Sequence, residues 1–139
     1  MTRANEPVFT DTGAWLALAL LRDPQHERAA DSWARLLGRG ARIRTSVPVI
    51  LETFTFLERN TTRDVALAWK DSLATVAHFR VLECTPADLE KAWPYFQRRD
   101  LHKLSAVDAT SFVLMRREKI RAAFAFDRHF AEAGFTIVE

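Results

Sequence analysis

The sequence predicts an α/β domain with a short, mostly parallel sheet that helices cover on both faces. Strand-like and helix-like segments alternate along the 139 residues. The strand-like segments are short and apolar and have no polar face, which is typical of strands buried in a parallel sheet. A chain of this length suits one domain with a substantial core, so we expect residues 1–139 to form a single domain.

Five strands and seven helices are expected along the chain. The strands are expected at residues 7–10, 41–45, 79–83, 120–126 and 135–138. The helices are expected at residues 12–21, 24–37, 46–59, 61–78, 86–98, 105–118 and 127–134. In open sheets of this class, ligands bind beyond the carboxyl ends of the strands, so the residues that follow each strand are of most interest.

The first half of the chain carries clear start and stop signals. PVFT is a short apolar strand, and the apolar run TGAWLALALL after it is typical of a buried helix. Asp23 and Pro24 predict the start of the next helix, because Asp caps a helix well and Pro suits its first turn. The segment GRG ends that helix after Leu37, ARIRT forms the second strand, and Ser46 begins the third helix.

The second half continues the alternation. Thr61 and Asp64 have the spacing of a capping box, which predicts the start of a helix. FRVLE is the third strand, and Thr85 caps the helix that follows it. Ser105 begins the helix SAVDATSFVLMRRE, IRAAFAF is a clear strand, and Gly134 ends a short helix before the last strand, FTIV.

Composition excludes several classes of protein. The longest apolar run, AWLALALL, has eight residues, too few to span a bilayer, and no cleavage pattern follows it, so we expect a cytoplasmic protein. The single cysteine, Cys84, excludes an internal disulfide and zinc sites built on several cysteines. The four histidines show no pairing four residues apart, which argues against a histidine-rich metal site. Net charge is +2 and 16 of the 20 basic residues are Arg, which is compatible with nucleic acid.

Four acidic residues interrupt apolar sequence at places that the expected fold would bring together. They are Asp11, Glu52, Asp108 and Asp127. Asp11 directly follows the first strand and Asp127 directly follows the strand AAFAF, so both belong at the ligand-binding edge of the sheet.

The other two acids lie on helical stripes that read as apolar. Asp108 shares a helical face with Phe112 and Met115. Glu52 likewise has Val49 and Phe56 at helical spacing. Taken singly, Asp11, Asp108 and Asp127 are each explained about as well by a helix cap, and Glu52 is explained better by a solvent-facing position. Their coincidence at one end of the sheet favours a shared site.

A shared site of four carboxylates needs a cation. At roughly 4 Å and an effective dielectric of about 20, each pair of carboxylates repels by about 4 kcal/mol. A hard divalent cation removes this repulsion, and Mg²⁺ prefers oxygen ligands. One or two such ions can hold a phosphodiester and activate water, so no nucleophilic side chain is required.

Four segments of the chain together resemble the PIN domain, and in particular the VapC-type toxins of bacterial toxin–antitoxin pairs. The segments are VFTDTGAWLAL, TSVPVILETFTFL, LSAVDATSFVLMRR and AAFAFDRHFAEAGFTIV. The resemblance implies a three-layer α/β/α sandwich and an endoribonuclease that depends on Mg²⁺ or Mn²⁺. It implies that Asp11 and Asp108 bind the metal directly, and that Glu52 and Asp127 bind it directly or through water. Asp100 is a candidate outer acid, although a role as a loop residue fits it better.

The resemblance also implies partners. It predicts an RNA substrate, a cognate antitoxin protein that covers the active site, and a homodimer. The region around Trp15 and Trp33 is the expected surface for the protein partner, unless both side chains belong to the core. The candidate RNA-contacting residues are Arg42, Arg44, Arg98, Arg99, His102, Lys103, Arg128 and His129.

Other functions remain open at this stage. PIN domains also occur in nucleases of RNA processing, and a non-catalytic α/β binding domain would have the same alternation of elements. A haloacid-dehalogenase-like phosphatase needs an acid two residues after Asp11, where this chain has Gly13. A response-regulator receiver needs an acidic pair near the start and a late Lys after a strand, and the sequence has neither in convincing form.

Overall fold

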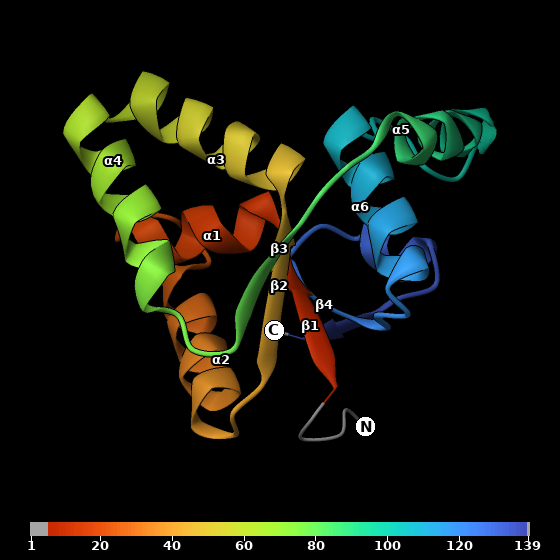
Figure 1. Ribbon diagram of the computed structural model, residues 1–139. Coiled ribbons are helices and arrows are strands. Elements are labelled where there is room, and N and C mark those ends of the chain that lie inside the picture. Colours follow the sequence, from red (N-terminus) through yellow and green to blue (C-terminus); the bar gives the residue numbers. More distant parts are fainter. Residues whose placement is uncertain (1–5, 139) are drawn as a thin grey trace.

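The computed structural model describes residues 6–138 (Figure 1). Its strands are β1 (Pro7–Thr10), β2 (Arg42–Ser46), β3 (Phe79–Leu82), β4 (Ala122–Phe124) and β5 (Thr136–Val138). Its α-helices are α1 (Thr12–Ala19), α2 (His26–Gly38), α3 (Val47–Asn60), α4 (Arg63–Ser72), α5 (Pro86–Ala92), α6 (Ala106–Arg117) and α7 (His129–Glu132). Short 3₁₀ turns, η1 (Leu73–Thr75) and η2 (Trp93–Gln97), follow α4 and α5.

All five strands are parallel, in the order β3-β2-β1-β4-β5, so the predicted parallel sheet is confirmed. Helices α1, α2 and α4 lie on one side of the sheet, and α5 and α6 lie on the other (Figure 1). The chain runs outward from β1 to β3 and then returns to add β4 and β5 on the opposite side of β1. The strand order therefore reverses between β1 and β4, which is where sheets of this class bind ligands.

Aromatic side chains hold the helices against the two faces of the sheet. On one side Trp15 packs edge-on against Trp33 and Trp69, with ring centroids 5.5 and 6.0 Å apart. On the other side the rings of Phe112 and Phe130 meet edge to face at 5.0 Å. Trp15 is only 3% exposed, so the expectation that it forms a partner surface is wrong.

Trp15 is tied to the sheet by a polar contact as well. Its indole Nε1–H donates to the hydroxyl of Thr45 in β2 at 3.1 Å, and that hydroxyl donates to the carbonyl of Thr10 in β1 at 2.9 Å. These bonds fix α1 relative to the ends of β1 and β2, where the candidate site lies.

Three of the predicted helix starts are confirmed by their caps. The hydroxyls of Ser46 and Ser105 accept backbone N–H groups at the starts of α3 and α6, and Thr85 forms a full capping box with Asp88. These caps satisfy N–H groups that have no partner within the helix.

Two other predicted helix starts are wrong. Helix α2 begins at His26, because Asp23 accepts the N–H of Gln25 in a turn before the helix. Helix α4 is capped by Thr62, whose hydroxyl accepts the N–H of Val65. The hydroxyl of Thr61 instead donates back to α3, so the capping box predicted for Thr61 does not form.

Helix α5 is joined to α6 by an ion pair between the buried carboxylate of Asp88 and the partly exposed guanidinium of Arg117. Burial acts to raise the pKa of Asp88, but hydrogen bonds from Thr85 and the charge of Arg117 together hold it below its usual value. The pair fixes the helix that carries Asp108. Within residues 6–138, no helix is long and apolar enough to cross a membrane.

Candidate metal centre

Asp11 lies at the point where the strand order reverses. Its N–H donates to the carbonyl of Phe124 at the end of β4, at 3.1 Å, so the residue is fixed between the two strands. Its side chain is buried, and Oδ1 has no hydrogen-bond partner within the described chain. The hydroxyl groups of Thr10 and Thr12 are likewise buried and have no hydrogen-bond partner within the described chain. Buried polar atoms usually have partners, so this group points to a missing ligand.

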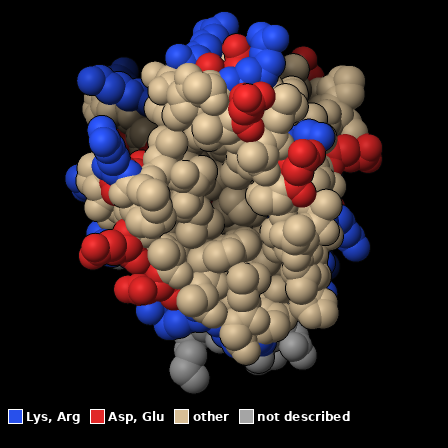
Figure 2. Space-filling model, turned by 90° about the vertical axis from the view of Figure 1, so that its left-hand side faces the viewer, with Lys and Arg blue, Asp and Glu red and all other residues tan. Residues whose placement is uncertain are grey.

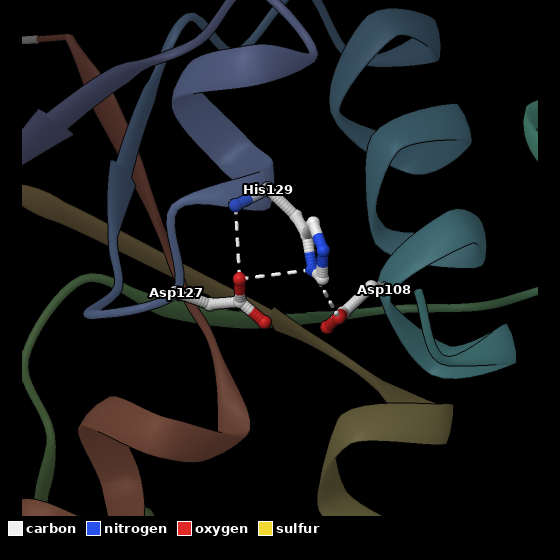
Figure 3. A group of neighbouring side chains, drawn as sticks. All are labelled: Asp108, Asp127 and His129. Carbon is white, nitrogen blue, oxygen red and sulfur yellow. Dashed lines mark hydrogen bonds and ion pairs between the residues drawn. The ribbon is translucent and has the colours of Figure 1, made fainter. Parts of the chain in front are cut away.

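Asp108 enters the site from the first turn of α6. Its N–H donates to the Ser105 hydroxyl at 3.0 Å, and its carboxylate faces the loop after β4 (Figure 3). The residue is 7% exposed, and Phe112 and Met115 on the same stripe are fully buried. The predicted inward-facing stripe of this helix is therefore confirmed.

Asp127 from the loop after β4, and His129 from the start of α7, approach Asp108 (Figure 3). The strand ends at Phe124, so the expectation that Asp127 directly follows it is wrong, and a turn brings the carboxylate to the site. Oδ1 of Asp127 accepts the N–H of His129 at 2.9 Å.

The imidazole of His129 is oriented from both sides. Nδ1 lies 2.9 Å from Asp127 Oδ1 and 3.7 Å from Asp108 Oδ2. Nε2 lies 2.6 Å from the backbone carbonyl of His102, which can only accept, so Nε2 carries a hydrogen. The ring therefore presents Nδ1 to the two carboxylates.

Glu52 lies on α3 and is half-buried. Its neighbours at helical spacing are apolar in both directions, but Val49 is fully buried whereas Phe56 is 42% exposed. The stripe that carries Glu52 therefore runs from the core to the surface. The charge of Glu52 nevertheless acts on both Asp11 and Asp108.

The electrostatics of the site reflect crowding of like charges. Burial, and then the charge of Asp108, raise the pKa of Asp11 well above its usual value, against a hydrogen bond from the Thr12 N–H. Glu52 and Asp127 add to this increase. Burial, and then Asp127, raise the pKa of Asp108 to about 7. An added positive charge would reverse these shifts.

The carboxylates and the imidazole offer a set of ligands for a metal ion. One ligand atom each from Asp108, Asp127 and His129 lies within 4.8 Å of the others. Asp11 lies outside this group of three, but it is close enough for the charges of Asp108 and Asp127 to raise its pKa. The sequence analysis expected His129 only as an RNA contact and not beside the acids, although its place two residues after Asp127 was a usable signal. Asp100 is instead exposed and forms an ion pair with Arg98 at 2.6 Å.

Comparisons with known proteins give consistent results. Residues 8–136 match the PIN domain family. The chain is 39% identical over 133 residues to the 23S rRNA-specific endonuclease VapC20 of Mycobacterium tuberculosis, covering 94% of this chain and 97% of that one. The crystal structure of VapC20, described as a Sarcin-Ricin loop cleaving toxin, superposes with a TM-score of 0.81 at 36% identity, covering 93% and 96% of the two chains. VapBC2 of Rickettsia felis shares the fold at 10% identity, with a TM-score of 0.69 and coverage of 94% and 96%.

The raised pKa values predict an unusual pH dependence for the metal-free protein. The native state holds a proton on Asp108 up to about pH 7, whereas the unfolded chain releases it near 3.8. The free energy of unfolding should therefore fall as pH rises between these values. The pKa of His129, raised by Asp127 and the His102 carbonyl against the effect of burial, acts in the same direction. Calorimetric melting in EDTA should show the transition temperature falling from pH 5 to pH 8.

Asp108→Asn is the matched variant for this measurement. Its melting temperature should fall less over the same pH range, because one of the two buried carboxyl groups with a raised pKa is gone while Asp11 and His129 still contribute. A wild-type protein whose stability is constant or rises over this range would contradict the crowding of carboxylates.

Proposed function

The chain belongs to the PIN-domain family, and on that premise we propose that it is a metal-dependent endoribonuclease, the toxin of a type II toxin–antitoxin pair. The observation that carries the proposal is the buried group of Asp11 and Asp108, with Glu52 and Asp127 close enough to raise their pKa values. A non-catalytic binding domain gives no reason to maintain such a group. We also propose that residues 1–139 act as a single domain.

The four acids are proposed to hold Mg²⁺ or Mn²⁺. Asp11 and Asp108 bind the ion directly, while Glu52 and Asp127 bind it directly or through water. When bound, the cation supplies positive charge to the phosphodiester and activates water for hydrolysis. The protein's own contribution is to hold its carboxylates in place through the end of β1, the first turn of α6 and the turn after β4.

His129 is proposed as a further ligand through Nδ1. A histidine that binds metal commonly donates its other ring N–H to a backbone carbonyl, and Nε2 of His129 does so to His102. A nitrogen ligand favours Mn²⁺ over Mg²⁺, because Mg²⁺ prefers oxygen. With His129 as a ligand, the site would prefer Mn²⁺ over Mg²⁺, a preference that four carboxylates alone would lack.

The proposed substrate is ribosomal RNA. The supporting observation is the identity of 39% to a relative described as 23S rRNA-specific, which extends over 94% of this chain. The same relative is described as a toxin, which favours the toxin role over a role in RNA processing. A toxin of this kind would act in the cytoplasm.

An antitoxin segment is proposed to bind an apolar groove beside the acids. The groove, about 610 Å³ in volume, lies between α3 and the start of α6. Leu51, Phe56 and Val107 line it, and Glu52 forms part of its wall. A segment with apolar side chains and one basic side chain would fill the groove and pair with Glu52.

A homodimer is proposed as well. The middle of the face on the α4 side carries few charged side chains (Figure 2), and charge depletion is typical of the centre of an interface. On α4 itself, Val65 and Leu67 are 40% and 41% exposed.

Neutralising the acids should abolish function without unfolding the protein. Asp11→Asn or Asp108→Asn should raise the metal-free melting temperature, because one member of a repelling group is lost. Mn²⁺-dependent cleavage of a fluorescent RNA should fall by at least about 100-fold. The double variant should lose little more, since residues that act as a unit are not additive. Glu52→Gln and Asp127→Asn should follow the same pattern, more mildly if they bind through water.

Glu90→Gln is the control, because Glu90 is an exposed acid on α5. It should change neither cleavage nor the effect of Mn²⁺ on melting. Near-normal cleavage by Asp11→Asn would refute the proposed site.

The role of His129 can be tested by metal preference. In His129→Gln, Mn²⁺ affinity should fall about 10-fold or more, and Mg²⁺ affinity should fall less. Isothermal titration calorimetry at constant pH measures both affinities. His102→Gln is the matched control, since only the backbone carbonyl of His102 contacts the ring. An equal loss for both metals would assign His129 a structural role only.

The groove can be tested through the protein partner. Leu51 is 62% exposed, so Leu51→Glu should leave the fold intact but weaken binding of the partner encoded by the neighbouring reading frame by about 30-fold or more. Co-purification followed by calorimetry would measure the loss. Leu21→Glu is the control, at another exposed apolar residue outside the groove. Undiminished binding by Leu51→Glu would place the partner elsewhere.

A further inference from the structure

Three arginines gather on one face of the sheet at strands β2 and β3. Arg44 and Arg80 are direct neighbours across the parallel pair, and Arg42 lies two residues before Arg44 on the same face. Thr45 points to the opposite face, where it bonds to Trp15 of α1. The arginines therefore lie on the face that α5 and α6 cover, and Arg80 reaches to within 3.8 Å of Glu118 at the end of α6.

These like charges are close enough to act on one another. Burial, and then the charges of Arg80 and Arg42, lower the pKa of Arg44. Glu118 acts in the opposite sense, but it also lies 3.1 Å from Arg117. Like charges opposite each other on neighbouring strands destabilise a sheet. Repulsion among the three arginines therefore destabilises the free protein, and binding of a polyanion would relieve it.

Arg44 is also held in place. Its Nη1 donates to the backbone carbonyls of Ile43 at 3.0 Å and His78 at 2.9 Å. Fixing a guanidinium in advance reduces the entropy lost when it binds a phosphate. Arg80 beside it has a side chain that is 64% exposed, so the group is open to a ligand.

We propose that Arg42, Arg44 and Arg80 form a docking strip for the phosphate backbone of the RNA substrate, separate from the metal centre. The inference rests on the proposed ribonuclease function and adds where the substrate is held. The strip lies on β2, and the same strand ends at Ser46, which caps the helix that carries Glu52. Phosphate contacts position an RNA without reading its sequence, so the strip would contribute affinity rather than selectivity.

The test is the salt dependence of RNA binding. A fluorescein-labelled RNA stem-loop is titrated with the full chain in EDTA, so that binding is measured without cleavage, between about 50 and 200 mM salt. In Arg80→Gln the magnitude of the slope of log affinity against log salt should fall by about 0.9, as expected for one lost phosphate contact. Arg44→Gln/Arg80→Gln should lower it by about twice as much. The decrease in slope should be the same when the stem-loop is replaced by an RNA of unrelated sequence.

Two further variants keep the result interpretable. Arg80→Lys retains the charge and should retain most of the slope. Arg63→Gln removes an arginine on α4 whose side chain is at least as exposed, at 76%, and should leave the slope unchanged. Mn²⁺ binding by each arginine variant, measured by calorimetry, should match the wild type and would show an intact fold.

The outcomes separate the docking strip from the proposed function. Wild-type protein that cleaves RNA with Mn²⁺, together with an Arg80→Gln variant of unchanged slope, would overturn the strip and leave the ribonuclease intact. A slope that falls equally in Arg63→Gln would also overturn it, because net charge alone would then explain binding. Wild-type protein that neither binds nor cleaves RNA would refute the ribonuclease itself.

Discussion

The repulsion between buried carboxylates at the reversal of strand order is the constraint on which the site depends. The backbone of Asp11 is held there by the N–H bond to Phe124, and its side chain is buried close enough to Asp108 for the charge of Asp108 to raise the pKa of Asp11. The fold therefore brings carboxylates together, and their mutual repulsion is relieved only when one of them is protonated or a cation binds. The raised pKa values of both residues mean that, in the metal-free protein, protonation relieves this repulsion.

The sequence was sufficient where local pattern and tertiary structure agree. The parallel sheet, the caps of α3 and α6, and the inward stripe of Asp108 with Phe112 and Met115 all follow from spacing, because burial there is decided within one helix or strand. The positions of Asp11 and Asp108 at one edge follow from the general placement of ligands in such sheets.

The features that could not be predicted depend on contacts between residues far apart in the sequence or on competition between neighbouring residues. The orientation of His129 is set by a carbonyl 27 residues earlier in the chain. The helix start at Thr62 was misplaced by one residue because Thr61, equally suited to capping, bonds back to the preceding helix.

The position of β1 in the sheet determines when the site can assemble during synthesis. Asp11 is translated early, but the strand that fixes it, β4, and the residues that face it, Asp108 and Asp127, come about a hundred residues later. A nascent chain that has not yet emerged beyond β4 therefore has half a sheet and no metal centre. A nuclease with this order of strands would in this way be inactive until β4 has left the ribosome that makes it. The order of strands would then delay activity during synthesis, before any inhibitor binds.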